Sequence, residues 1–311
     1  MAFSLKRLLL VCILVSCGVV LLSTPLLLRF SVYSERTLSM GYQDVIPLRK
    51  YSSTFWCENV TTMSPHTFNA YLYDSAEANV TEHSVQNRRV HVRVASYYYL
   101  GMYFLRGSNL SITCCPAGRG TKLHLIAGLG KLEQCLRAVT GRNGSSHNSS
   151  FPVPPVRGPI LDSQIERTST GWSVRCVSEA SVDLVPGACG GGGSPLSPRP
   201  VLWHKAQADG YHYLLFLNDP ASEAYNDVQL GVSAWRRVFD RNRTLDACRE
   251  ALNCSLPLAF LSRQFVVAER SRSTPARAEP VFLYARCEPR RKVYFLFYLG
   301  FAVLFMVVAF Q

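Results

Sequence analysis

The chain has 311 residues, of which 48% are hydrophobic and 17% charged, with 11 cysteines and a net charge of +12. These proportions exclude a disordered chain and a charge-rich coiled coil. The positive charge alone would allow a nucleic-acid-binding protein. The apolar runs, cysteines and glycosylation motifs described below argue against that class and favour an exported, membrane-anchored protein.

An uncharged apolar run opens the chain. Lys6 and Arg7 precede Leu8 to Leu28, a run of 21 residues. At about 1.5 Å per residue, a helix of this length spans a hydrocarbon core of about 30 Å. The run is longer than the apolar region of a cleaved signal peptide, which has about 7–15 residues. We therefore expect residues 1–29 to form a cytosolic stub and a signal-anchor transmembrane helix, with a cleaved signal peptide as the alternative.

A first β-rich unit is expected at residues 30–142. An aromatic stretch at 97–105 indicates a strand, and residues 131–139 favour a short helix. Apolar residues with the strand period of two precede the aromatic stretch, at Val90, Val92 and Val94.

Linkers are expected at residues 143–200, around a short middle segment. The stretches 143–159 and 186–200 are rich in Gly, Ser, Asn and Pro, which is typical of exposed loops.

A second β-rich unit is expected at residues 201–289. Strand patterns occupy 211–217, 259–268 and 281–286, and a short helix is predicted at 245–252. Short strands separated by Gly, Asn and Pro turns are typical of antiparallel sandwiches.

The two units share an aromatic motif. Tyr97-Tyr-Tyr-Leu in the first unit is similar to Tyr211-His-Tyr-Leu in the second, which indicates either a duplicated domain or two strands with the same β propensity. The predicted fold class is mostly β: two antiparallel β-sandwich-like ectodomain units flanked by two transmembrane helices.

A second uncharged run, Val293 to Phe310, predicts a C-terminal transmembrane helix within residues 290–311. Two spans place both termini in the cytosol and residues 29–292 in the lumen or outside the cell, in the endomembrane system or plasma membrane. The basic cluster at 290–292 then lies outside, against the positive-inside rule, but long loops translocate largely regardless of charge. A GPI-attachment signal is the alternative for this tail.

Seven of the 11 asparagines begin an Asn-x-Ser/Thr motif, all between the apolar runs. This density predicts N-glycosylation in the secretory pathway. The predicted sites are Asn59, Asn79, Asn109, Asn143, Asn148, Asn242 and Asn253.

Nine cysteines lie between the runs and are disulfide candidates, whereas Cys12 and Cys17 lie within the first run. Adjacent Cα atoms are about 3.8 Å apart, too close for a disulfide, so neighbouring cysteines are expected to bond elsewhere. An odd count leaves one thiol over or bonded to another chain. The candidates are Cys57, Cys114, Cys115, Cys135, Cys176, Cys189, Cys248, Cys254 and Cys287.

Proximity in the sequence suggests two local pairings and the nearest partners of the adjacent cysteines. Cys176–Cys189 and Cys248–Cys254 are plausible local loops. The nearest partners of the adjacent pair, Cys114 and Cys115, are Cys57 and Cys135.

No motif of a common enzyme class is present: HExxH, Walker A, GxSxG and Rossmann glycine patterns are all missing. We expect His204 and His212 to be structural rather than metal ligands. Trp172, Trp203 and Trp235 are expected to pack in the core or at an interface rather than form a binding platform. We expect no catalytic residue, metal site or cofactor.

Several motifs of the second unit occur in a fixed order: Tyr211-His-Tyr-Leu-Leu-Phe-Leu-Asn, Cys254-Ser-Leu-Pro-Leu-Ala-Phe, Phe265-Val-Val-Ala-Glu and Cys287-Glu-Pro-Arg-Arg. In this order they resemble the ectodomain of the aberrant-pollen-development family of membrane-anchored RING E3 ubiquitin ligases and its animal relatives. Residues 97–112 resemble the N-terminal extracellular domain of the same family.

The resemblance implies a cytosolic RING after the second span, but this chain contains no Cys-x-x-Cys pair of the kind that binds RING zinc. Ligase activity is therefore not expected of this sequence. It would return only with a longer form that carries a RING.

The leading interpretation is an N-glycosylated, disulfide-bonded, membrane-anchored ectodomain that binds an unknown protein or glycan ligand or scaffolds partners on the exoplasmic side. One alternative is a ligase-family member that acts in ubiquitination through a longer form or by pairing with a full-length relative. Homo- or hetero-oligomers with family members are expected as partners. The other is a glycosaminoglycan-binding adhesion module, because the net charge without Lys6 and Arg7 is +10. The densest basic cluster is Arg236, Arg237, Arg241 and Arg243.

Overall fold

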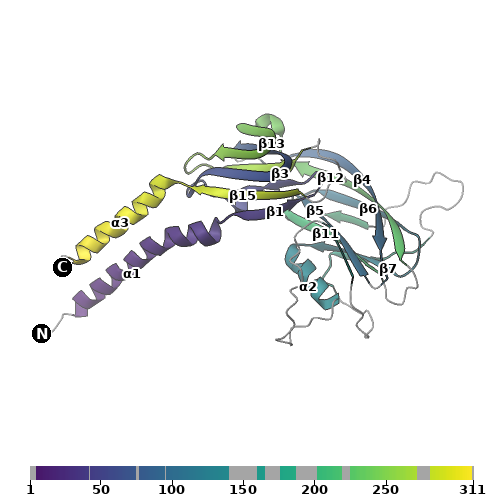
Figure 1. The fold of residues 1–311 in the computed structure, drawn as a ribbon, viewed down its shortest axis with the longest axis horizontal. Helices are drawn as coiled ribbons and strands as arrows, with labels where there is room; N and C mark the ends of the chain where they lie inside the picture. The colour runs from purple at the N-terminus through teal and green to yellow at the C-terminus, as the bar shows by residue number, and fades with distance from the viewer. Residues whose placement is uncertain are drawn as a thin grey trace.

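The computed structural model describes residues 5–41, 43–74, 77–94, 96–139, 160–164, 176–186, 202–218, 225–271 and 281–309. Figure 1 shows two long helices that leave one end of a β-rich body side by side. These are α1 (Leu5–Leu27), extended by a π-helical turn (Leu28–Val32), and α3 (Arg291–Ala309). Apart from Lys6 and Arg7 in α1 and Arg291 and Lys292 in α3, both helices are uncharged, as the two runs in the sequence predict.

The strands form three antiparallel sheets. The proximal sheet, which is nearest the helices, has the order β1 (Arg36–Met40), β15 (Val281–Pro289), β3 (Cys57–Asp74), β14 (Gln264–Arg270), β2 (Val45–Pro47), with β13 (Asp246–Pro257) also paired to β3. The outer sheet has the order β10 (Leu202–Lys205), β6 (Asn109–Pro116), β12 (Asn226–Val238), β4 (Val80–Val92). The inner sheet has the order β8 (Ile160–Gln164), β5 (Ser96–Phe104), β11 (Gly210–Asn218), β7 (Thr121–Ala127), β9 (Ala180–Asp183).

The outer and inner sheets pack face to face as a sandwich. Alternate residues of both sheets fill one apolar core, which includes Ile112 and Val228 from the outer sheet and Leu123 and Leu214 from the inner sheet. This alternation is the period-two pattern expected of strands with one buried face. The sequence prediction of a mostly β, antiparallel protein is confirmed.

The other face of the inner sheet is covered by α2 (Leu129–Val139), the short helix predicted at 131–139. Leu132 and Leu136, four residues apart on one face of α2, pack with Tyr97 and Tyr99. Both tyrosines are therefore buried, although they point away from the sandwich core.

The two predicted units do not form separate sandwiches. In the inner sheet, β11 of the second unit lies between β5 and β7 of the first, and in the outer sheet β12 lies between β4 and β6. In the proximal sheet, β3 pairs with β13, β14 and β15. The expectation of two separate sandwich-like units is wrong because strands far apart in the sequence complete each other's hydrogen bonding.

The shared aromatic motif belongs to two neighbouring strands. Leu100 of β5 lies opposite Leu214 of β11, and Tyr103 lies opposite Tyr211. Both segments are central strands of one sheet whose two faces are buried, and such positions favour aromatic and apolar residues. Their similarity is therefore explained by their shared environment.

Two local predictions have different outcomes. Residues 281–286 form part of β15, as predicted. The helix predicted at 245–252 is wrong, because residues 246–252 lie in β13, whose Cys248 pairs with Ala70 of β3. Backbone pairing with the long neighbouring strand overrides the local helical pattern.

A buried ion pair joins the three sheets. Arg236 of β12 in the outer sheet donates through Nη1 to Asp44 Oδ1 at 3.3 Å, next to β2 of the proximal sheet. The same guanidinium donates to the carbonyl of Tyr103 on β5 of the inner sheet, at 3.3 Å. Complete burial raises the pKa of Asp44 and lowers the pKa of Arg236, while each charge opposes the shift of the other.

Candidate functional site

The helix pair defines one end of the molecule. A Cβ on Gly18 of α1 would lie 3.6 Å from the side chains of Phe301 and Leu304 of α3, so the helices approach closely. Side chains such as Val19 and Phe305 remain exposed, at 60% and 62%. Within the described residues, one helix is long and apolar enough to cross a membrane by length and composition, at Cys12–Val32.

An aromatic cluster lies at the base of α3. The ring of Trp56 lies 5.7 Å from that of Tyr294 and 5.2 Å from that of Phe297, and Phe55 lies 5.5 Å from Phe260. Aromatic side chains with an apolar body and a polar tip are enriched where a membrane meets water. We call these five residues the juxtahelical aromatic cluster.

Arg290 fixes the loops that carry this cluster. Its Nη2 donates to the carbonyls of Cys57 at 3.0 Å and Leu258 at 2.6 Å, immediately before α3 begins. In the sequence, Arg290 stands out only as part of the basic cluster at 290–292 beside a predicted span. The structure shows that its guanidinium holds two loops against the start of the helix.

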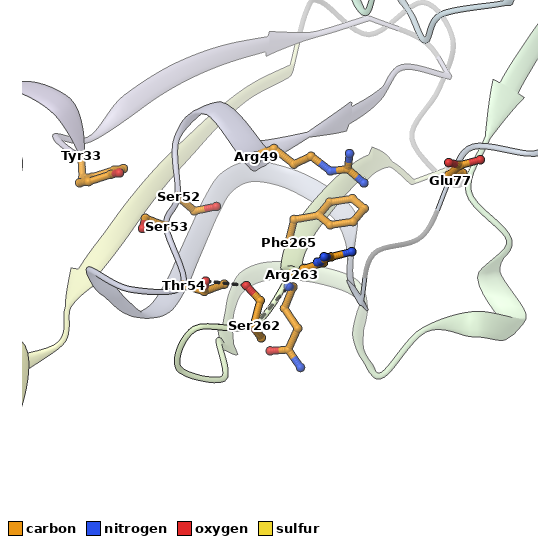
Figure 2. Close-up of a pocket in the computed structure, with 10 residues that line it drawn as sticks. Tyr33, Arg49, Ser52, Ser53, Thr54, Glu77, Ser262, Arg263 and Phe265 are labelled. Carbon is orange, nitrogen blue, oxygen red and sulfur yellow. Dashed lines mark hydrogen bonds between the residues drawn. The ribbon is translucent and has the colours of Figure 1, made fainter.

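A pocket of about 550 Å³ lies beside these loops, next to Tyr33, which follows the π-helical turn at the end of α1 (Figure 2). The guanidinium of Arg49 lies 3.7 Å from the centre of the Phe265 ring. Arg263 and Glu77 also line the pocket, so its charged groups are two cations and one anion. This lining suits an anionic group better than a cationic one.

The serines of the pocket shape its walls. Ser52 Oγ donates to the carbonyl of Leu48 at 3.0 Å, and Ser262 Oγ donates to the carbonyl of Ala259 at 2.8 Å. Thr54 Oγ1 donates to the carbonyl of Ser262 at 2.8 Å, which joins the two loops that border the pocket (Figure 2). Hydroxyls committed to backbone carbonyls stabilise turns and are not activated nucleophiles.

Three disulfides join described cysteines. Cys248–Cys254 confirms the predicted local loop. The expected pairing of Cys176 with Cys189 is wrong, because Cys176 bonds to Cys135 of α2. The expected pairing of Cys57 with the adjacent cysteines is also wrong.

Cys57 instead bonds to Cys287, 230 residues away in the sequence. The reason is the pairing of β3 with β15, which brings the two strand ends together. Cys115 is disulfide-bonded, and burial raises the pKa of the neighbouring Cys114 thiol to about 12. Cys189 lies outside the described residues.

The predicted glycosylation asparagines differ in exposure. Asn79, Asn109, Asn242 and Asn253 are exposed. Asn59 is half-buried, and its Nδ2 donates to Glu288 at 3.3 Å. Asn143 and Asn148 lie outside the described residues.

The four arginines of the predicted basic cluster do not form one exposed patch. Arg236 points inward and is buried, since alternate residues of β12 face opposite sides of the sheet. Arg241 pairs with Glu82 at 2.9 Å and with Glu269 at 2.7 Å. Arg237 donates to the carbonyl of Asn79 at 3.0 Å, whereas the Arg243 side chain is 72% exposed. The arrangement gives no support to a glycosaminoglycan site on this cluster.

His204 and His212 lie within the sheets, on β10 and β11. The rings of His204 and His212 are 5.2 Å apart, and burial lowers the pKa of both, as it does for His124. In the part of the chain that the structure describes, no group of three or more His, Cys, Asp or Glu could hold a metal ion.

Trp203 is not in the core. It is 61% exposed and stacks on Trp235, with ring centres 6.0 Å apart and planes inclined by 12°. The expectation of core packing is therefore wrong for Trp203, while packing at an interface stays a prediction. Trp172 lies outside the described residues.

These features define a disulfide-bonded, antiparallel β-protein with an apolar N-terminal helix, the combination found in membrane-anchored extracellular domains. Residues 201–308 match the family model of the middle domain of the E3 ubiquitin-protein ligases APD1-4. The match confirms the family resemblance of the second unit. It spans β10 to β15 and most of α3, and it includes the middle domain alone, with no catalytic RING.

Other comparisons add no functional information. No curated protein matches this chain. The VP2 subviral particle of infectious bursal disease virus aligns over 86% of this chain and 84% of its own, at 9% identity and a TM-score of 0.18. The Gt strain of that virus aligns over 84% and 81%, at 7% identity and a TM-score of 0.21. TM-scores this low do not indicate a shared fold.

Proposed function

We propose that the chain is an N-glycosylated ectodomain protein anchored in the membrane by α1 and α3, with a binding or scaffolding role on the exoplasmic side. The observation that carries the proposal is that the two apolar helices lie side by side at one end of the β-rich body (Figure 1). The juxtahelical aromatic cluster at that end and the disulfides in the body support an arrangement with this end at the membrane and the body on the exoplasmic side.

The topology is tested with the full chain in cells. Tags at both termini should be reached only after the plasma membrane is permeabilised, and glycosidase treatment should increase the gel mobility. Alkaline carbonate should leave the chain in the membrane pellet. A C-terminal tag that is accessible on intact cells would show that α3 does not cross the membrane, and an unchanged mobility would remove the luminal assignment.

The pocket beside Tyr33 is the proposed contact site for an exoplasmic partner that carries an anionic group. Proximity labelling from the ectodomain of the wild-type chain in intact cells should label a neighbouring protein. This label should be lost with the double variant Arg49→Ala/Arg263→Ala. Arg243→Ala is the matched control, because this exposed arginine lies on another part of the surface. Labelling that is equal in all three chains would argue against this pocket.

The family match favours a second candidate, a role in ubiquitination through a longer form or a full-length relative. An open reading frame that continues beyond Gln311 into Cys-x-x-Cys pairs would support this role. Unchanged ubiquitination at the membrane after deletion of the gene would count against it.

A further inference from the structure

An exposed aromatic surface lies on the outer sheet, away from the helices and from the pocket beside Tyr33. The stacked pair Trp203 and Trp235 is extended by His83, whose ring centre lies 4.9 Å from that of Trp235. Because Val232 and Ala234 point into the sandwich core, Trp235, the next residue of β12, must point outward. The hollow beside the two indoles measures about 560 Å³.

Asn109, which begins a glycosylation motif, lines the same hollow. On β6 it lies directly between two neighbouring strands, opposite Trp235 of β12 and Lys205 of β10. Directly opposite residues in an antiparallel pair share one face, with Cβ atoms about 4.5–5.5 Å apart. A sugar attached to Nδ2 of Asn109 therefore starts beside the indole rings.

We infer that the N-glycan at Asn109 packs its first sugar rings against Trp203 and Trp235, so that the chain covers its own aromatic surface. The C–H groups on one face of a pyranose ring are apolar and fit a flat aromatic surface, while the hydroxyls at the ring edge stay in water. Trp203 is 61% exposed and Trp235 is half-buried, so without a cover the pair leaves apolar surface in solvent. The inference rests on the luminal topology proposed above, which the glycans at other sites test separately.

The test is a double-mutant cycle on the glycosylated full chain in detergent. Asn109→Gln should lower the unfolding midpoint by about 2–4 °C, the shift produced by one contact of ordinary strength in a domain of this size. In a Trp203→Ala background, Asn109→Gln should cause no further shift, because the stacking surface is already lost. Asn242→Gln is the matched control, since Asn242 is an exposed glycosylation-motif asparagine flanked by Arg241 and Arg243.

A second measurement does not depend on the stability of the Trp variant. Acrylamide quenching of tryptophan fluorescence should increase with Asn109→Gln and stay unchanged with Asn242→Gln. Unchanged quenching, or an equal effect of Asn109→Gln in both backgrounds, would overturn the inference and leave the tryptophans to a separate ligand. Glycans at other sites with none at Asn109 would also overturn it. A chain without any glycan would instead refute the luminal topology.

Discussion

Replacing Arg236 by methionine should reveal how strongly the buried ion pair holds the three sheets together. The guanidinium donates to the carbonyl of Gln43 at 2.9 Å, as well as to Asp44 and Tyr103, and it lies 4.6 Å from the centre of the Phe104 ring. Without it, Asp44 is a fully buried carboxyl that retains only the backbone N–H groups of Gly41 and Tyr103. Removing one partner of a buried ion pair costs about 3–5 kcal/mol.

This cost is a large part of the 5–15 kcal/mol by which a domain is ordinarily stable. It corresponds to a fall of about 6–20 °C in the unfolding midpoint, which differential scanning calorimetry of the full chain can measure. Loss of the guanidinium should raise the pKa of Asp44 further. Because the folded-state pKa is then above the unfolded one, the penalty should shrink as the pH falls and Asp44 becomes protonated.

Two variants distinguish the ion pair from a general effect of charge. Arg243→Met removes an exposed arginine and should change the stability by no more than about 0.5 kcal/mol. Asp44→Asn should recover part of the stability lost in Arg236→Met, because it removes the uncompensated charge. Equal losses from the two arginine variants, or a double variant that is no more stable than Arg236→Met, would refute the reasoning.

Three further predictions concern the disulfides and the pH dependence of stability. Cys57→Ala/Cys287→Ala should lower the free energy of chemical unfolding by about 5 kcal/mol, against about 2 kcal/mol for removal of the disulfide within β13. The difference is expected because the two bonds close loops of very different length. Equal losses of stability would argue against loop-closure entropy as the cause. His124, His204 and His212, whose pKa values are lowered by burial, stay neutral in the fold but take up protons in the unfolded chain below about pH 6.5. The free energy of unfolding should therefore fall on acidification by at most about 4 kcal/mol per pH unit. His212→Gln should reduce this slope by about a third, and an unchanged slope would contradict the lowered pKa of His212. Hydrogen bonds from Thr61 and Asn59 lower the pKa of Glu288, so the stability that this carboxylate contributes is present above about pH 4.5 and is lost as the pH falls further. Glu288→Gln should remove this part of the acid unfolding transition. An acid transition identical to that of the wild type would show that these hydrogen bonds are not formed.

The juxtahelical aromatic cluster and the aromatic surface beside Asn109 could be predicted only in part from the sequence. Phe55 and Trp56 stand directly before Cys57 in the sequence, yet nothing local indicates that they meet Tyr294. Likewise, the motif at Asn109 is visible in the sequence, but its position opposite Trp235 depends on the register between β6 and β12. Both sites are made by residues more than 100 positions apart, which only the folded chain brings together.

Features that depend only on neighbouring residues were predictable before folding was considered: the apolar helices, the alternating strands, the helix at 131–139, the glycosylation motifs and the disulfide between Cys248 and Cys254. Their signals are periodicity, composition and short spacing, which need no knowledge of the rest of the chain. The tertiary structure alone decided that the two units interleave and that Cys57 bonds to Cys287. It also decided that Arg236 is buried while Trp203 is exposed. In an antiparallel sheet each strand is completed by partners from anywhere in the chain, so strand order, disulfide pairing and the exposed face follow from long-range hydrogen bonding and core packing rather than from local sequence.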